Sequence, residues 1–263
     1  MKLPFAQIDA FATRPFEGNP AAVMPLDTWL DDATLQAIAS ENNLSETAFL
    51  VRDASGAADY ALRWFTPASE VALCGHATLA SGHFLLSNDP ALERVTFSTR
   101  QAGMLAVSRA SAGYELALPA WTPAPKPLPD VVAALGVEAV ETLWYDKGYV
   151  LVVLADEAAV RAVAPDGRAI AALGKLVVIV SAKGETADIV SRVFTHAYDI
   201  PEDPVTGSAH AVAVPYWAEK LGRTSMSAYQ ASARGGHLQC RLEGDRVILG
   251  GACVTVIEGA FHF

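Results

Sequence analysis

Two stretches of the chain share one arrangement of residues that can bind a small anion. The first runs from Phe65-Thr66 to Cys74-Gly75-His76-Ala77, and the second from Phe194-Thr195 to Thr206-Gly207-Ser208-Ala209. Each reads as a strand that ends in Phe-Thr, a loop with an acidic residue, and a glycine that opens an apolar, helix-forming run. The acidic residues are Glu70 and Asp203, which precede their glycines by five and four residues.

A helix that begins at such a glycine leaves backbone N–H groups unpaired at its N-terminus, where they can hold an anion. Two such termini that face each other would clamp a carboxylate without help from Lys or Arg. A substrate held in this way needs one well-placed acid or base to move a proton. The repeated pattern therefore predicts a small-molecule carboxylate as substrate, with Gly75 and Gly207 among the groups that bind it.

Composition limits the partners. The 263 residues are 52% apolar and 18% charged, which is typical of a globular protein with one large domain or two small ones. A net charge of -10 without any Lys/Arg cluster argues against nucleic acid. No run approaches the ~20 apolar residues of a membrane span, and the first eight residues predict a strand rather than a signal peptide. Cys74, Cys240 and Cys253 form no CxxC pair, which favours free thiols and a cytoplasmic location.

The elements that must position these residues alternate in two similar series. Short strands surround a helix predicted over residues 75–86 in the first series and over 208–221 in the second. The prolines of residues 119–129 predict a linker between them. We therefore predict an α+β fold of two pseudo-symmetric halves, residues 1–119 and 127–263. Each half is expected to be a curled, mostly antiparallel, barrel-like sheet around one central helix, and the last strand can pack back on the first half.

Several motifs resemble those of the phenazine-biosynthesis PhzF-like family, whose two-domain fold is shared with diaminopimelate epimerase. The motifs lie in the family's order along most of the chain. They are Asp9-Ala10-Phe11, Phe16-Glu17-Gly18-Asn19-Pro20-Ala21-Ala22-Val23, Asn43-Leu44-Ser45-Glu46-Thr47-Ala48-Phe49, Phe65-Thr66-Pro67, Leu73-Cys74-Gly75-His76-Ala77-Thr78 and Glu202-Asp203-Pro204-Val205-Thr206-Gly207-Ser208-Ala209. The resemblance implies a homodimeric isomerase that needs no cofactor.

The resemblance also implies roles for single residues. Glu46 takes the place of the glutamate that removes a proton and returns it elsewhere on the substrate. His76, Asp203 and Ser208 fall on the other polar positions of the family's cleft between the domains. We therefore expect Glu46, Asp203 and His76 to be catalytic, and the substrate to be bound by Gly75, Gly207, Ser208, Cys74, Thr206 and Asn19. For Ser208, a cap at the start of a helix is an equally good interpretation.

Other functions stay open at this point. Epimerases and racemases of this fold use two facing cysteines, one before each glycine. Cys74 stands at the first position, but Thr206 stands at the second, and its hydroxyl is far too weak an acid to replace a thiol with a pKa of ~8.5. An epimerase with a different second base and a catalytically silent binding protein remain alternatives. The histidines form no recognisable metal-binding pattern, so no metal is expected, and His83 is expected to lie at the surface or to be packed rather than to be a ligand.

Overall fold

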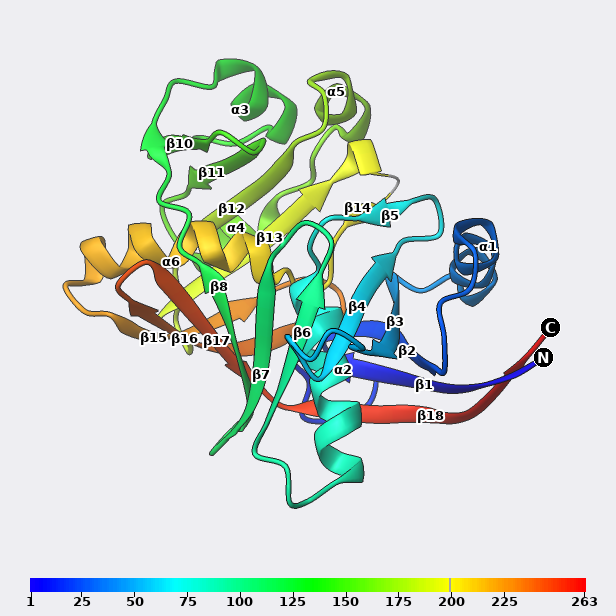
Figure 1. The fold of residues 1–263 in the computed structure, drawn as a ribbon. Coiled ribbons are helices and arrows are strands. Elements are labelled where there is room, and N and C mark those ends of the chain that lie inside the picture. Colours follow the sequence, from blue (N-terminus) through cyan, green and yellow to red (C-terminus); the bar gives the residue numbers. More distant parts are fainter. Residues whose placement is uncertain (199) are drawn as a thin grey trace. The chain divides into compact units, whose positions relative to one another are not determined.

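The structure, a computed structural model, describes residues 1–198 and 200–263 (Figure 1). The chain divides into two compact units, one of residues Met1–Ala117 and Gly250–Phe263, the other of residues Leu118–Leu249. The last strand, β18 (Cys253–His262), belongs to the first unit because it pairs antiparallel with β1 (Lys2–Ala10). Figure 1 shows this pair running side by side to the two ends of the chain.

The first unit is built on one continuous series of paired strands. β18 and β1 are followed by β2 (Asn19–Leu26), β3 (Glu46–Arg52), β4 (Tyr60–Phe65), β6 (Arg94–Thr99), β7 (Met104–Ala110) and β8 (Gly113–Pro119). The pairs are antiparallel except for β2 with β3 and β4 with β6. The short β5 (Glu70–Val71) adds to the end of β4.

One apolar helix fills the inside of this curled sheet. The helix α2 (Gly75–Asn88) contacts β1, β2, β3, β6, β7 and β18, and nine of its residues are buried. A helix that is apolar on every side must be enclosed by other elements. Gly82 lets β7 approach closely, since a Cβ there would lie 2.3 Å from Val107 Cγ1. On the other face of the sheet, α1 (Asp32–Asn42) packs Leu35 and Ile38 against Phe49.

The second unit repeats the same order of strands. β9 (Ala124–Pro125), β10 (Glu141–Tyr145), β11 (Tyr149–Val153), β12 (Val177–Lys183), β13 (Ile189–Thr195), β15 (Ser225–Gln230) and β16 (Gly236–Glu243) pair one after another, and β17 (Arg246–Gly251) follows. The parallel pairs are β11 with β12 and β13 with β15, at the same two places as in the first unit. β14 (Ile200–Glu202) adds to β13 as β5 adds to β4. The predicted α+β fold of two similar halves is confirmed.

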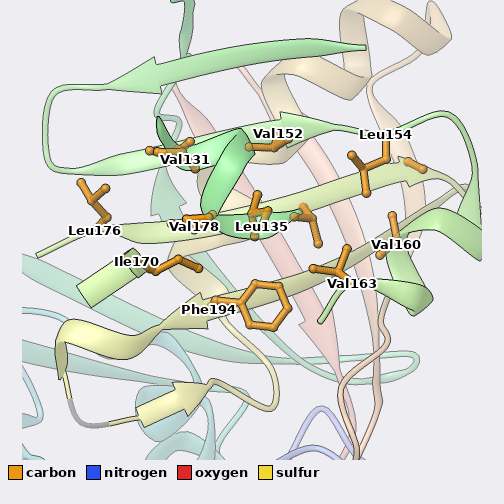
Figure 2. Packing of buried hydrophobic residues seen from close by; sticks show 14 of the residues in the cluster. Val131, Leu135, Val152, Leu154, Val160, Val163, Ile170, Leu176, Val178 and Phe194 are labelled. Carbon is orange, nitrogen blue, oxygen red and sulfur yellow. The ribbon is translucent and has the colours of Figure 1, made fainter. Parts of the chain in front are cut away.

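Alternate residues of β12 face two different cores. Ser181 accepts a hydrogen bond at 2.9 Å from Trp217 Nε1 on α6 (Gly207–Leu221), which contacts β11, β12 and β16. Val178 and Val180 face the opposite way, into a core closed by α3 (Pro129–Leu135), α4 (Glu157–Ala162) and α5 (Gly167–Ala172). Figure 2 shows Val178 in this core among side chains from all three helices.

Some elements differ from the sequence-based expectation. The proline-rich segment, expected to be a linker, contains β9, whose Ala124 and Pro125 pair with β10. Proline is tolerated there because β9 is an edge strand. The helix α5 and the 3-10 helix His196–Tyr198 were not predicted, since neither is long enough to show helical periodicity. No helix in the described part of the chain is long and apolar enough to cross a membrane.

Candidate active site

A carboxylate and an imidazole meet inside the first unit. Glu46 is the first residue of β3 and His76 is the second residue of α2, so a strand end and a helix start bring them together. Glu46 Oε2 lies 3.0 Å from His76 Nε2, and the two side chains are 13% and 5% exposed. Although the two atoms are close, Oε2 is a buried acceptor that makes no aligned hydrogen bond. A buried acceptor in that state gains free energy from any donor, or proton, that reaches it.

Two more predicted site residues hold the same imidazole. Cys74, the N-cap of α2, places its Sγ 3.4 Å from His76 Nδ1. Asn19, the first residue of β2, places its Nδ2 3.2 Å from the same nitrogen. The side chains of Cys74, His76 and Asn19 are all buried. The structure therefore gathers Asn19, Glu46, Cys74 and His76 at the head of α2, next to Gly75.

The pKa shifts show which of these groups carries charge. Burial lowers the pKa of His76, but the negative charges available to Cys74 and Glu46 outweigh burial and raise it well above its ordinary value. Burial and the neighbouring Glu46 raise the pKa of the Cys74 thiol to about 11. Because the Cys74 thiol therefore keeps its proton near neutral pH, the contact with Glu46 is the one that favours the protonated imidazole there.

The predicted residues of the second unit form a separate group. Thr206 donates its hydroxyl hydrogen to Asp203 Oδ2 at 2.5 Å. Gln230, the last residue of β15, accepts from Thr206 N at 2.8 Å and donates to the Asp203 carbonyl at 2.7 Å. Gln230 is fully buried, so these bonds fix the loop in front of α6. Sequence reasoning missed Gln230, because a polar residue at a strand end carries no signal of its partner.

Two details of the expected duplication need correction. Ser208 is the second residue of α6 and the N-cap is Thr206, whose side chain makes no capping bond, so the N-cap role expected as an alternative for Ser208 is wrong. The counterpart of Glu70 is also Glu202 rather than Asp203, because Phe65 pairs with Glu70 and Phe194 pairs with Glu202. Glu202 precedes Gly207 by five residues, the same spacing as from Glu70 to Gly75.

Two arginines that sequence reasoning did not identify explain why Glu202 corresponds to Glu70. Arg63 Nε lies 2.8 Å from Glu70 Oε1, with a second bond of 2.8 Å from Nη2 to Oε2. Arg192 binds Glu202 in the same two-pronged way, at 2.8 and 3.0 Å. Each guanidinium also lies over the ring of the phenylalanine two residues later, at 4.9 and 5.0 Å. The two acids thus brace the loops that lead into α2 and α6, and the spacing Arg-x-Phe-Thr is the signal that could have revealed them.

His83 is packed, as expected. Its Nδ1 lies 3.1 Å from Tyr114 Oη and its Nε2 lies 2.9 Å from Thr255 Oγ1. Burial lowers the pKa of His83. Both ring nitrogens are therefore used in structural contacts two turns away from His76.

Comparison with known proteins identifies the family. The family model described as PhzC-PhzF, phenazine biosynthesis-like protein, matches residues 8–259. The chain belongs to this family. A family relative named an uncharacterised isomerase, from Pseudomonas aeruginosa, is 48% identical over the full length of both chains. The crystal structure of a PhzF family protein from Enterococcus faecalis covers both chains completely, with 46% identity and a TM-score of 0.92.

More distant members of the fold are known as well. A hydroxyproline epimerase from Agrobacterium vitis is 11% identical and has a TM-score of 0.64, covering 98% of this chain and 92% of that chain, which shows the shared fold alone. Together with the isomerase names of the full-length relatives, the family fold identifies the chain as an isomerase-type enzyme.

Proposed function

We propose that this PhzF-like enzyme moves a proton within a small carboxylate-bearing metabolite, without a cofactor, and that Glu46 is the base that takes and returns the proton. The observation that carries this proposal is the buried, unaligned Oε2 of Glu46, 3.0 Å from His76 Nε2. A general base must have an oxygen within reach of the substrate proton, and the contact of Oε2 with His76 is not an aligned hydrogen bond. The carboxylate is held by its strand and needs little reorganisation to react.

His76 supports the base by its charge. As a cation beside Glu46, it compensates the carboxylate in a site that water scarcely reaches, and its ring can donate to an oxygen where negative charge develops on the substrate. Cys74 is unsuited to be the base, because its thiol holds its proton up to a pKa of about 11. We therefore assign His76 an electrostatic role, and we propose that Cys74 lines the site without transferring a proton.

Each helix head, α2 in the first unit and α6 in the second, is proposed as a group that can bind a substrate carboxylate. Neither N-cap residue, Cys74 or Thr206, caps its helix by a bond from its side chain to a backbone N–H group of the first turn. N–H groups near Gly75, Gly207 and Ser208 are the kind that hold a carboxylate in other proteins. A sulfate or carboxylate at either helix head, in crystals grown with that anion, would support this part of the proposal.

The second unit favours one base over two. β12 repeats β3 in the order of strands, and its first residue is Val177 where β3 has Glu46. Thr206 stands where α2 has Cys74. An epimerase that inverts a centre needs a second proton-transferring group, and neither Val177 nor Thr206 can supply one. Removal and return of the proton by Glu46 alone requires no such partner.

Deuterium exchange tests the proposal. The enzyme is incubated with a panel of carboxylated metabolites in deuterated water, and label in each compound is followed by NMR. Glu46→Gln should lower exchange of the responsive compound by ~100-fold or more while binding survives, because the amide keeps the shape but cannot accept the proton. The exposed Glu41, at the end of α1, provides the control Glu41→Gln, which should exchange at the wild-type rate. Undiminished exchange in Glu46→Gln would assign the base elsewhere, and saturable binding without any exchange would favour a binding protein.

A further inference from the structure

The head of α2 offers one sulfur, one nitrogen and one oxygen atom to a metal ion. The ligand atoms of Glu46, Cys74 and His76 all lie within 4.8 Å of one another. We propose that these three residues form a binding site for Zn²⁺, and that the bound ion blocks the site. Thiolate and imidazole ligands select zinc over magnesium or calcium, which prefer oxygen alone. Three protein ligands would leave the fourth position of the ion to water or to a substrate oxygen.

The distances suit a tetrahedral ion after a small adjustment. Zinc lies about 2.3 Å from sulfur and about 2.0 to 2.2 Å from nitrogen or oxygen, so tetrahedral ligand atoms are about 3.4 to 3.6 Å apart. Cys74 Sγ is 3.9 Å from His76 Nε2, and Glu46 Oε2 is 3.0 Å from the same nitrogen. Each distance differs from the tetrahedral value by only about 0.4 Å. The sulfur now lies nearer to Nδ1, at 3.4 Å, so the Cys74 side chain must turn toward Nε2 and Glu46 for all three atoms to bind one ion.

The surroundings of the three ligands also fit a metal. Glu46 Oε2 is a buried oxygen that makes no aligned hydrogen bond and therefore has lone pairs to give. The far nitrogen of the imidazole, Nδ1, contacts the Asn19 amide at 3.2 Å. A metal-bound imidazole normally donates from its far nitrogen to an oxygen that fixes the ring, and Asn19 can present its amide oxygen by a flip. The buried positions of Cys74 and His76 would protect the ion from competing ligands in water.

The charges and protons of this binding step balance. The Zn–S bond forms as the Cys74 thiol loses its proton, and the Zn–N bond forms as His76 Nε2 loses its own, with both protons released to the buffer. No electron is transferred. A thiolate and a carboxylate together neutralise the two charges of the ion, so the filled site carries no net charge into a buried environment.

Cobalt is a direct probe of the site because Co²⁺ takes zinc positions and is coloured. Titration of the purified, metal-free enzyme with Co²⁺ should give one equivalent of tetrahedral visible bands and a sulfur-to-cobalt charge-transfer band, both removed by Zn²⁺. Cys74→Ser should abolish the charge-transfer band. Cys253→Ser, at the half-buried thiol of β18, is the matched control and should retain it. Asn19→Ala should weaken binding by about 10-fold through the loss of ring orientation.

Three results would overturn the site: no charge-transfer band in the wild-type enzyme, a band that survives Cys74→Ser, or a band that Cys253→Ser removes. X-ray absorption of zinc-loaded wild-type enzyme gives a second measurement that needs no variant, and it should show one sulfur at about 2.3 Å among nitrogen and oxygen ligands. A spectrum without sulfur would also exclude the site.

The inhibitory effect rests on the proposed function of Glu46. Zn²⁺ should stop deuterium exchange at the concentration that fills the cobalt-competent site, and a chelator should restore it. If the ion binds through Cys74 but exchange continues unchanged, the metal site stands and the role of Glu46 as base is wrong. Failure of the metal site and failure of the proposed function therefore give different results.

Discussion

The heads of α2 and α6 are built on the same scaffold but carry different side-chain contacts. Both follow a strand whose arginine binds a glutamate five residues before the helix glycine. In both, a side chain four residues after the N-cap bonds the N-cap carbonyl, Thr78 Oγ1 at 2.6 Å and His210 Nδ1 at 2.8 Å. At α2 the remaining positions carry ionisable groups that face one another. At α6 the corresponding loop is closed by hydrogen bonds through Gln230.

The two buried histidines show the same contrast. His76 is held beside Glu46, and the balance of burial and neighbouring negative charge raises its pKa. His210 has no carboxylate partner among its contacts in the described structure, and burial lowers its pKa to about 4. The surroundings thus favour the charged form of His76 and the neutral form of His210. The duplicated fold therefore supplies a helix head twice, while the close carboxylate–imidazole pair of Glu46 and His76 lies at the head of α2.

The strongest test of this contrast compares the acids of the two heads. Glu46→Gln should lower deuterium exchange by ~100-fold or more, since it removes the base. Asp203→Asn should cost much less, because Thr206 can still donate its hydroxyl hydrogen to the amide oxygen. Exchange measured by NMR on the same substrate decides between them. Equal losses would make the two acids partners in one reaction and would favour a mechanism with two proton-transferring groups.

The bracing arginines should differ in their contribution to stability. Arg63 is 4% exposed and also contacts Asp32 at 2.9 Å, whereas Arg192 is 15% exposed. Breaking a buried ion pair leaves an uncompensated charge, so Arg63→Met should lower the free energy of unfolding by about 3 kcal/mol and Arg192→Met by about 2 kcal/mol. Urea unfolding measures both. The exposed Arg14 pair provides the control, because Arg14→Met should cost less than ~1 kcal/mol.

If Arg192→Met cost no more than the control, the second loop would be braced by Gln230 and the sheet alone. A larger loss of unfolding free energy in Arg192→Met than in Arg63→Met would contradict the prediction. The stronger ion pair would then lie in the second unit.

The lowered pKa of His210 predicts a dependence of stability on pH. The unfolded chain binds a proton at this residue below about pH 6.5, but the folded unit binds it only below about pH 4. Stability should therefore fall as the pH drops from about 6.5 to 4, by up to about 3 kcal/mol. Urea unfolding across this range should show a smaller slope for His210→Leu. The exposed His262 is the control, and a slope unchanged in His210→Leu but reduced in His262→Gln would contradict the assignment.

The sequence predicted the repeated scaffold because its signals are local. A glycine before an apolar helical run predicted both helix starts, at Gly75 and Gly207, and the alternation of strands predicted two similar halves. The contacts that distinguish the heads depend on residues from separate segments. Glu46 reaches His76 only because β3 runs parallel to β2 and α2 lies inside the sheet, and no spacing in the sequence encodes that distance.

The three-dimensional structure was also needed to identify which acidic residue of the second repeat corresponds to Glu70. Asp203 was matched to Glu70 because both precede a glycine, but pairing across β13 and β14 assigns Glu202 to that place. The loop between Arg192 and Glu202 is three residues longer than that between Arg63 and Glu70, which hid the correspondence. The roles of the site residues stay predictions, and they rest on the family and on the geometry around His76.

The smallest expected effect concerns the bond that ties the N-cap carbonyl at the head of α2. Thr78→Val keeps the size of the fully buried side chain but removes its hydrogen bond to Cys74 O, so it should lower the free energy of unfolding by about 1 kcal/mol. Ser81→Ala removes a similar bond to Ala77 O, one turn further from the site, and should cost about as much. Of these two side chains only that of Thr78 bonds Cys74, so deuterium exchange should fall in Thr78→Val and persist in Ser81→Ala. Equal exchange in the two variants would mean that the Thr78 hydrogen bond stabilises the helix without positioning its first residues. The bond that Thr78 and His210 each make to an N-cap carbonyl would then have only a structural role.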